Sequence, residues 1–329
     1  MGIKSGPMAG RDYPGTYQQF LEWFADEAAC RRYVLHCRWP EGFECARCGA
    51  KSQPWTTNRG YLHCRECGCE VSVTAGTIFE RTRLPLKTWF AAMWFVTSQK
   101  DGASALGLKR VLGFGSYQTA WAWLHKLRQA MIRPGREHLS GRIEVDETYI
   151  GGTDTGGKRG RGSEKKEIVV IAVEVKFPKG FGRLRMRRIP DVSGESLVPF
   201  VCDVAEKGSE ILTDGWGGYN RLSKCGYKHE RVFLSGTGDP AHISMPGVHR
   251  IAALVKRWVL STHQGSVSQK HLEYYLDEYT FRFNRRSSRS RGMLFYRLMQ
   301  QAVVTPPLPY RQIVERNHNI WGCPTTYLR

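Results

Sequence analysis

The chain has 329 residues, of which 41% are hydrophobic and 12% aromatic, a composition that allows the buried cores of two or three domains. Its 49 Lys and Arg against 30 Asp and Glu give a formal net charge of +19, which indicates a polyanion-binding protein; the alternative is a merely solvated basic surface. The most apolar run, residues 89–96, is too short to span a bilayer and no secretory leader opens the sequence, which excludes membrane classes and predicts a cytoplasmic, nucleoid-associated protein.

The predicted elements begin with a helical segment in residues 1–38. Aromatic side chains recur at helical spacing in residues 16–24, and a second helix is expected to begin at Asp26. A cysteine-rich region of a different kind follows this segment.

Two C-x-x-C pairs mark residues 39–80 as a zinc ribbon. Cys45 and Cys48 form the first pair, and Cys64 and Cys67 form the second, after fifteen intervening residues. This spacing closes a tetrahedral thiolate cage around Zn²⁺, and the glycine after each pair suits a turn that aims N–H groups at the sulfurs. Four thiolates leave no open position on the metal, so the zinc is predicted to be structural.

The other six cysteines are expected to play no metal-binding role. Cys30, Cys37 and Cys69 read as bystanders, although Cys69 or His63 is an alternative fourth ligand. The isolated cysteines are expected to be small core residues: Cys202, Cys225 and Cys323.

A small helical bundle is predicted in residues 81–135. Residues 86–97 are apolar nearly all round, as in a buried helix. Residues 103–112 and 116–131 read as two further helices on either side of a glycine turn.

This pair of helices is a candidate helix-turn-helix. Ser116 is placed to cap its second helix, whose buried stripe is predicted to be Trp121, Leu124 and Leu127. The outward-facing residues are the predicted DNA contacts: Tyr117, Gln118 and Lys126. An ordinary helical hairpin is the alternative.

The pattern of residues 140–300 changes to strands alternating with helices. Strands are predicted at 142–150, 167–175, 184–189, 210–214 and 231–234, and helices at 195–206, 250–260 and 268–284. The order of three strands, helix, strand, helical segment, strand and helix is that of a ribonuclease-H-like domain, with a mixed five-stranded sheet and covering helices. Residues 301–329 are predicted to form a C-terminal tail.

Asp146 and Asp214 each close a short apolar run, and they fall on the first and fourth of these strands. Acidic residues on those two strands meet at one metal site in a ribonuclease-H-like fold. Two such carboxylates hold divalent cations about 3.5–4 Å apart, as phosphodiester cleavage requires. We therefore expect two catalytic Mg²⁺ or Mn²⁺ ions.

A third ligand in many such sites comes from the helix after the fifth strand, with a basic residue seven positions later on the same face. His249 and Lys256 have that spacing. Between the first two strands, a glycine-rich basic loop at residues 153–163 is expected either to touch phosphate through Lys158, Arg159 and Arg161 or to be disordered.

The chain resembles the zinc-ribbon DDE transposases of bacterial insertion sequences, the ISXO-like group, over nearly all of its length. The motifs that carry the resemblance are WPEGF at 39–43, VTAGTIF at 73–79, VDETYIGG at 145–152, TDGW at 213–216 and YLDEYTFRFNRR at 275–286. The resemblance implies that Asp146, Asp214 and a third residue on the late helix bind the catalytic metal.

His249 departs from that pattern, because many relatives carry Glu at the third position. Imidazole nitrogen is a softer ligand that suits Mg²⁺ less well than carboxylate does. His249 is therefore expected to bind one metal weakly, to favour Mn²⁺, or to act as a base or phosphate contact; a structural histidine is the alternative.

Several other acidic residues lie near this constellation in the sequence. Glu278, Asp277 and Glu273 offer a replacement carboxylate, although their charge and periodicity favour a solvated helix face. Glu144 and Glu147 flank Asp146 and are expected on the opposite face of the sheet.

The densest basic patch near the late helices is predicted to grip phosphates of transposon-end or target DNA. It comprises Lys256, Arg257, Arg282, Arg285, Arg286, Arg289 and Arg291. In the loop between these helices, His263 and Gln264 are expected either to touch DNA or to stabilise the turn.

The predicted function is that of a transposase that binds the terminal inverted repeats of an insertion sequence, cleaves strands at the ends and joins the 3′-OH to target DNA. Its expected partners are double-stranded DNA and further copies of the chain, as a dimer or higher oligomer, with no membrane. A catalytically inactive zinc-ribbon and helix-turn-helix binder, or a ribonuclease-H-like nuclease without strand transfer, is the alternative. The two converging aspartates disfavour a pure binder.

Overall fold

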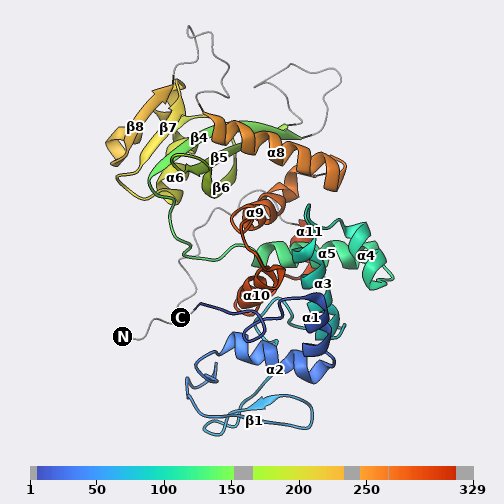
Figure 1. Cartoon of the computed structure of the whole chain (residues 1–329). Coiled ribbons are helices and arrows are strands. Elements are labelled where there is room, and N and C mark those ends of the chain that lie inside the picture. Colours follow the sequence, from blue (N-terminus) through green and yellow to red (C-terminus); the bar gives the residue numbers. More distant parts are fainter. Residues whose placement is uncertain (1–5, 152–165, 233–244, 266, 316–329) are drawn as a thin grey trace. The chain divides into compact units, whose positions relative to one another are not determined.

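The structure is a computed structural model that describes residues 6–151, 166–232, 245–265 and 267–315 (Figure 1). The chain divides into two compact units, of which unit 1 comprises residues up to Arg133 together with Ser287–Glu315 and unit 2 comprises Pro134–Arg286. None of the described helices is long and apolar enough to cross a membrane.

Unit 1 consists mainly of helices. They are α1 (Tyr17–Trp23), α2 (Glu27–Arg38), α3 (Leu86–Ser98), α4 (Ala105–Leu112), α5 (Tyr117–Ala130), α10 (Arg291–Ala302) and α11 (Tyr310–Glu315). Asp26 begins α2 as predicted, because its side chain accepts a hydrogen bond from the N–H of Ala29 at 2.7 Å and satisfies an otherwise free donor.

An aromatic cluster assigns α10 to unit 1. The Phe295 ring on α10 lies 5.6 Å from Phe20, 5.7 Å from Phe24 and 5.7 Å from Phe90, and all four side chains are buried. The compact domain predicted at residues 140–300 therefore differs from the observed division, which falls at Arg286, because α10 buries its apolar face among the N-terminal helices.

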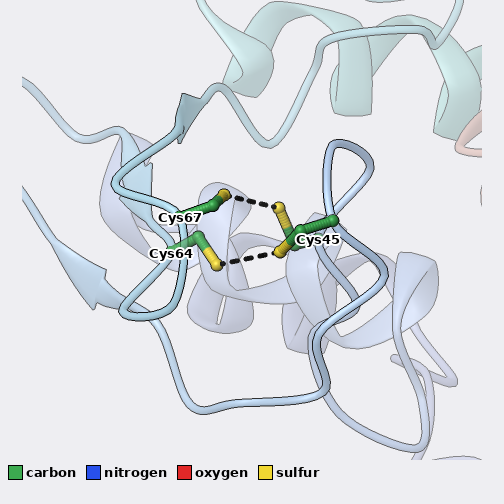
Figure 2. Close-up of side chains that lie close together, drawn as sticks. Cys45, Cys64 and Cys67 are labelled. Carbon is green, nitrogen blue, oxygen red and sulfur yellow. Dashed lines mark hydrogen bonds between the residues drawn. The ribbon is translucent and has the colours of Figure 1, made fainter.

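The zinc-ribbon region contains a small antiparallel sheet of β1 (Trp55–Thr56), β2 (Leu62–His63) and β3 (Glu70–Val71). Two tight turns carry the C-x-x-C pairs, and Gly49 and Gly68 both adopt φ of 70° in them. Only glycine takes this left-handed conformation without strain. The two turns therefore bring all four cysteine side chains to one place (Figure 2).

Helices α4 and α5 form the predicted helix–turn–helix. Gly113 ends α4 in the left-handed conformation with φ of 66°, and Ser116 begins α5 by accepting a hydrogen bond from the N–H of Gln118 at 3.1 Å. Leu124 and Leu127 are buried, as predicted for the inner stripe, whereas Trp121 is half-buried.

Unit 2 contains a mixed five-stranded sheet with the strand order β6-β5-β4-β7-β8. Its strands are β4 (Arg142–Gly151), β5 (Lys166–Val175), β6 (Phe181–Ile189), β7 (Glu210–Asp214) and β8 (Lys228–Val232). The first three pair antiparallel, whereas β7 runs parallel to β4 and β8 parallel to β7. This order and these directions confirm the predicted ribonuclease-H-like fold.

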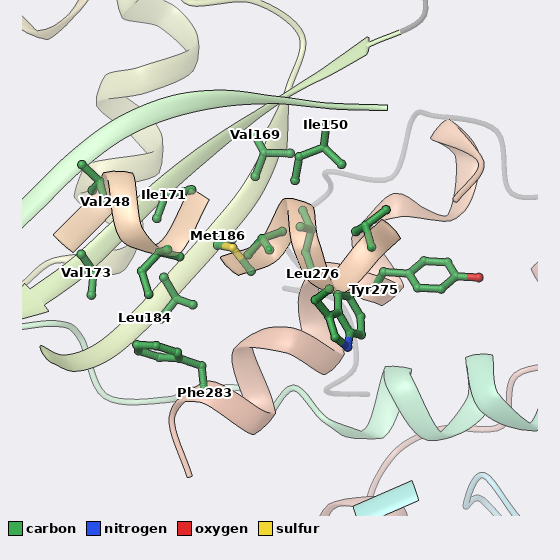
Figure 3. Packing of buried hydrophobic residues seen from close by; sticks show 14 of the residues in the cluster. Ile150, Val169, Ile171, Val173, Leu184, Met186, Val248, Tyr275, Leu276 and Phe283 are labelled. Carbon is green, nitrogen blue, oxygen red and sulfur yellow. The ribbon is translucent and has the colours of Figure 1, made fainter. Parts of the chain in front are cut away.

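Helices cover both faces of the sheet. Helix α6 (Gly194–Val204) buries Leu197, Phe200 and Val201 on one face, and α8 (Pro246–His263) and α9 (Leu272–Phe283) cover the other. In Figure 3 the second face is formed by strand residues such as Ile171 and Leu184 packed against Val248 of α8 and Leu276 of α9. Strand β5 is apolar on its two sides, as expected for a strand that is covered on both faces.

Candidate functional site

Strands β4 and β7 place the two aspartates at the same level of the sheet. The last registered pair between these parallel strands is Glu144 with Leu212. Asp146 and Asp214 each lie two residues further along, so they continue the same register on adjacent strands. Side chains two residues apart share a face, and Leu212 packs in the core beneath α8. Both aspartates therefore belong to the face that α8 covers.

Asp146 is a poorly solvated carboxylate, with 20% of its side chain exposed. Burial, together with the like charges of Glu147 and Asp214, raises its pKa to about 7. The N–H of Glu147 donates to its Oδ1 at 2.9 Å, and Lys256 lies close enough to oppose the rise. Asp146 thus lies at a point of concentrated negative charge in a basic protein.

Asp214 is held by its own loop. Its Oδ1 accepts a hydrogen bond from the N–H of Trp216 at 3.0 Å, and the indole Nε1 of Trp216 donates to the Val192 carbonyl at 2.8 Å. The loop after β7 therefore holds the carboxylate of Asp214 in place.

Helix α8 brings the two predicted partners to Asp146. The Nδ1 of His249 lies 3.9 Å from Oδ2 of Asp146. Lys256 lies seven residues later on the same helix. Burial and the nearby Lys166 lower its pKa, whereas Asp146 acts to raise it. The seven-residue spacing therefore does put His249 and Lys256 on the side of α8 that faces the aspartates.

These side chains have the chemistry of a divalent-metal site, although they are not tightly gathered. Carboxylate oxygens are the ligands that Mg²⁺ and Mn²⁺ prefer, and repulsion between unpaired carboxylates is relieved by a cation. Among the described residues, only the four ribbon cysteines bring three or more potential ligand atoms within 4.8 Å of one another. Asp146, Asp214 and His249 therefore fit a metal through their donor atoms but need side-chain movement to close around it.

Glu144 is a member of the site that sequence analysis assigned to the wrong face. Its carboxylate Oε2 accepts a hydrogen bond from the N–H of Val248, at the start of α8, at 2.9 Å, and only 2% of the residue is exposed. It therefore lies on the same face as Asp146, two residues away, as strand alternation requires. Burial raises the pKa of Glu144, and the N–H groups of Val248 and Gly247 act to lower it.

Glu144 fixes the start of α8 against β4. Met245, the residue before the helix, makes no side-chain capping bond, so the carboxylate of Glu144 takes that place. Gly247 permits the approach, because a Cβ there would lie 2.7 Å from Oε2 of Glu144. His249 follows one residue after the bonded N–H group, so Glu144 sets the position of its backbone.

Glu147 does lie on the opposite face, as predicted. The hydroxyl of Tyr219 donates to its Oε2 at 3.1 Å, and Tyr219 is fully buried in the core beneath α6. Burial and the charges of Glu147 and Asp146 raise the pKa of Tyr219 well above its usual value, so it remains a neutral donor.

The acidic residues of α9 do not form the solvated face that the sequence suggested. Glu278 is 0% exposed and forms an ion pair with Arg282 at 2.9 Å, which allows the carboxylate to be buried. Glu273 accepts a hydrogen bond from the N–H of Arg188 at 2.8 Å, and Asp277 is half-buried. Glu273 and Glu278 are thus engaged in holding α9 in place.

The ribbon cysteines match the geometry of a four-thiolate zinc site. The sulfurs of Cys45 and Cys67 lie 3.7 Å apart, as do those of Cys48 and Cys64 (Figure 2). Neighbouring sulfurs of a tetrahedral site with Zn–S bonds of about 2.3 Å lie about 3.8 Å apart. Backbone N–H groups in the first turn lower the pKa of Cys45 to about 6, whereas burial and the neighbouring thiols raise the pKa of Cys67 to about 12.

The remaining cysteines differ in their surroundings. Burial raises the pKa of Cys30 and Cys37 to about 12 in each case, so both are unreactive thiols. Cys69 is half-buried beside the second turn. The prediction of a small core residue is wrong for Cys202, which is exposed, whereas Cys225 is half-buried; Cys323 lies outside the described residues.

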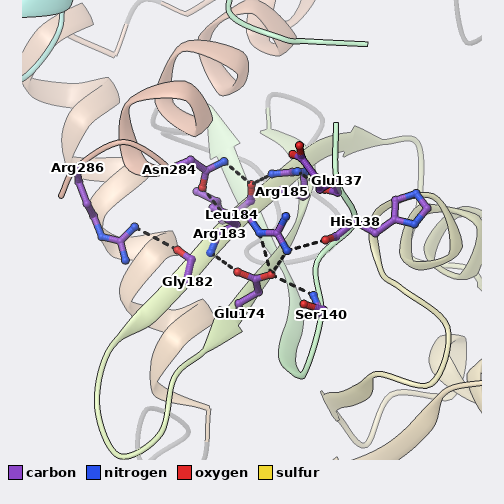
Figure 4. A network of polar contacts seen from close by, with 10 residues as sticks. All are labelled: Glu137, His138, Ser140, Glu174, Gly182, Arg183, Leu184, Arg185, Asn284 and Arg286. Atoms are coloured by element: carbon purple, nitrogen blue, oxygen red, sulfur yellow. Dashed lines mark hydrogen bonds and ion pairs between the residues drawn. The ribbon is translucent and has the colours of Figure 1, made fainter. Parts of the chain in front are cut away.

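Much of the predicted basic patch is engaged in structure. Arg282 pairs with Glu278, and the Arg285 guanidinium lies 4.0 Å above the Phe281 ring. Arg286 lies 3.9 Å above the Phe283 ring and donates to the Gly182 carbonyl at 3.2 Å, within a network at the end of β6 (Figure 4).

That network secures both segments by which the chain enters and leaves unit 2. Arg183 pairs with Glu174 at 2.6 Å and donates to the His138 carbonyl at 2.7 Å, while Asn284 bonds the backbone of Leu184 in both directions (Figure 4). Arg286 joins this network although its side chain is exposed, whereas Arg285 is half-buried and bonds the Phe281 carbonyl. Arg257 on α8 is exposed, and the exposed Arg289 belongs to unit 1.

The predicted DNA contacts of α5 are only partly at the surface. Tyr117 and Gln118 in its first turn are exposed, whereas Lys126 is half-buried, with its Nζ 5.9 Å from the centre of the Trp89 ring. Lys158, Arg159 and Arg161 lie outside the described residues. His263 packs against Trp258 and Tyr275 at 4.8 Å and 4.7 Å, as in the turn-stabilising alternative, and Gln264 ends α8 with φ of 52°.

Comparison with known proteins gives two family matches. Residues 138–284 match the ISXO2-like transposase domain, and residues 25–70 match the transposase zinc-ribbon domain. A protein described as an uncharacterized protein in transposable element ISH50, from Halobacterium salinarum, is 24% identical over 280 residues, which cover 80% of this chain and 92% of that protein. The catalytic core domain of BIV integrase is 15% identical with a TM-score of 0.28, over 43% of this chain and 82% of that chain.

Proposed function

We propose that this chain, which matches an ISXO2-like transposase domain and a transposase zinc-ribbon domain, is a zinc-ribbon DDE transposase that cleaves DNA at the ends of an insertion sequence and joins the freed 3′-OH to target DNA. The observation that carries the proposal is the placement of Asp146 and Asp214 at one level of adjacent strands, beneath the helix that bears His249 and Lys256. Both aspartates stand on hydrogen-bonded strands of one sheet, so the reacting phosphate would meet groups that are already positioned.

Asp146, Asp214 and His249 would hold the metal. Bound Mg²⁺ or Mn²⁺ would neutralise phosphoryl oxygens and activate the attacking water or 3′-hydroxyl. Lys256 offers a cation near Asp146, and we propose that it contacts a phosphate beside the scissile one. Asp146 repels its acidic neighbours in the metal-free protein, so metal binding and loss of its proton are coupled.

Unit 1 would bind the DNA ends. We propose that Cys45, Cys48, Cys64 and Cys67 hold one structural Zn²⁺ and that the exposed first turn of α5, with Tyr117 and Gln118, contacts base edges. Arg257 and Arg289 remain candidates for phosphate contacts, and the chain is proposed to act on double-stranded DNA as a dimer or higher oligomer. Arg285 and Arg286 are proposed for the same role as phosphate contacts, and Arg286 is the more exposed of the two.

The test is an assay of three steps on one preparation of the protein and one set of labelled end fragments. Asp214→Asn should bind the fragments as the wild type does, because the carboxylate holds metal and not DNA, but it should neither cleave them nor join them to a plasmid. Cleavage without joining by the wild type would instead indicate a nuclease. Binding without cleavage by the wild type, in both Mg²⁺ and Mn²⁺, would indicate a pure DNA-binding protein.

A further inference from the structure

A groove of about 820 Å³ lies along one side of α5 in unit 1. Gln118, Ala122 and Lys126, which are four residues apart on the helix, line it together with the segment 81–84. Beyond its first turn, α5 has no exposed residue between positions 120 and 130. This helix therefore cannot lie along a DNA groove over its full length, and the surface it offers a ligand is its first turn and this groove.

The groove has a rigid apolar floor. The rings of Trp89 and Trp123 are stacked with centroids 3.6 Å apart and planes 9° from parallel, and Phe114 packs edge-on against Trp123 at 4.9 Å. The Nε1 of Trp89 donates to the hydroxyl of Thr82 at 2.8 Å, which fixes the segment 81–84 to α3. The groove is thus already formed by packed side chains, as in most ligand sites.

The charges that line the groove have one sign. Arg81, Arg83 and Lys126 are the charged lining residues, and no carboxylate is among them. Lys126 is half-buried, and its ammonium lies over the Trp89 ring. Within the described part of the chain, no carboxylate forms an ion pair with it. A partly desolvated cation without a counter-charge is unfavourable until an anion arrives.

Arg81 adds backbone strain to this picture. It adopts φ of 54°, a left-handed conformation that residues with a Cβ seldom take, and its side chain is 92% exposed with a weak contact of 3.6 Å to Glu80. Such strained residues concentrate at ligand clamps. The strain turns the chain so that Arg81 and Arg83 both border the groove.

We propose that this groove holds the sugar–phosphate backbone of one strand of the element-end DNA, with Arg81, Arg83 and Lys126 against phosphates and the aromatic floor against deoxyribose. Phosphate contacts of this kind set the register of a protein on a duplex. The first turn of α5, with the exposed Tyr117 and Gln118, then meets the adjacent bases. The inference rests on the proposed function, because only a transposase would bind element-end DNA.

The experiment measures the affinity of the full-length protein for end DNA over a range of salt concentrations. The test variant is Arg81→Gly with Arg83→Ala; glycine relieves the left-handed strain, so loss of the fold is not the expected result. The control, Lys207→Ala with Lys224→Ala, removes two exposed positive charges from unit 2. Each phosphate contact contributes about 0.9 to the slope of log K against log salt, so the test variant should reduce the slope by about 1.8.

We expect the test variant to bind at least tenfold more weakly near physiological salt, with the control close to wild type in both affinity and slope. Lys126→Met, which keeps the length of the side chain, should reduce the slope by about 0.9. Equal slopes for the test variant and the control would overturn the groove assignment while leaving the transposase proposal intact, provided that the wild type still binds and cleaves. Failure of the wild type to bind any DNA would overturn both.

Discussion

Replacing Asp146 by Asn should stabilise the metal-free protein while abolishing cleavage. The carboxylate lies in a poorly solvated position beside Glu147 and Asp214, and its pKa of about 7 compares with an ordinary value of 3.8. Each pKa unit corresponds to about 1.4 kcal/mol, so ionised Asp146 destabilises unit 2 by at most roughly 4 kcal/mol above pH 7. Asn keeps the oxygen that accepts the Glu147 N–H bond and has no charge to repel.

The pH dependence gives this prediction its sign. A carboxyl group with a raised pKa binds more protons in the folded state than in the unfolded state between pH 4 and pH 7, so stability is lost as pH rises through that window and stays level above it. Wild type and Asp146→Asn should therefore be about equally stable near pH 4. They should diverge with rising pH, and the variant should be more stable at pH 8 by between about 1 and 4 kcal/mol, since 20% exposure of the side chain leaves part of the charge solvated.

Hydrogen exchange at the β4 and β5 amides is the appropriate assay, because it reports on unit 2 by itself. The protein should carry its zinc and no added Mg²⁺ or Mn²⁺, and chelators should be left out because they would also strip the ribbon cysteines. Glu195→Gln, on an exposed side chain of the same unit, serves as the control for loss of one negative charge. Equal or lower protection of Asp146→Asn at pH 8 would refute the account of Asp146 as a repelled carboxylate.

Three further outcomes follow from the geometry. Cys64→Ser should lose the bound zinc and unfold the ribbon, which metal analysis and circular dichroism would detect; full zinc retention would contradict the four-thiolate assignment. Glu144→Ala should destabilise unit 2 by about 2–3 kcal/mol because it leaves the Val248 N–H unpaired, whereas Glu144→Gln, which keeps an acceptor, should cost about 1 kcal/mol; equal losses in chemical unfolding would argue against the capping role. His249→Ala should lose most cleavage and His249→Glu should shift the preferred ion from Mn²⁺ toward Mg²⁺; normal Mg²⁺-dependent cleavage by His249→Ala would remove it from the site.

Short local sequence patterns predicted the structure most reliably. The C-x-x-C pairs fix their own turns within a few residues, and the glycines that follow adopt the conformation those turns need. Asp146 and Asp214 were found because each closes an apolar run; Asp214 does end β7, whereas Asp146 lies in the middle of β4, which continues to Gly151. The order of strands and helices identifies the fold in which such residues meet. In each case the signal and the structure occupy the same short stretch of chain.

Contacts between residues far apart in the chain could not be predicted from such patterns. Glu273 looks solvated on its helix, yet it accepts a hydrogen bond from the N–H of Arg188, which lies 85 residues earlier in the chain. Helix α10 follows the catalytic residues in sequence, yet its aromatic face packs in unit 1. Lys126 has the spacing of a surface residue, but it is half-buried in a groove that the distant segment 81–84 also lines. None of these contacts leaves a periodic trace in the sequence.

Glu144 connects the two kinds of information. Strand alternation alone places it on the face of Asp146, but its partner, the N–H of Val248, lies 104 residues further along the chain. The bond holds the first turn of α8, and His249 is the next residue. Because the backbone of His249 is held, its imidazole can approach Asp146 only by rotation of the side chain. The distance of 3.9 Å between His249 Nδ1 and Asp146 Oδ2 is therefore set by the rotamer of His249. If His249 holds the metal as proposed, the choice of metal would depend on His249 itself and not on a rearrangement of α8.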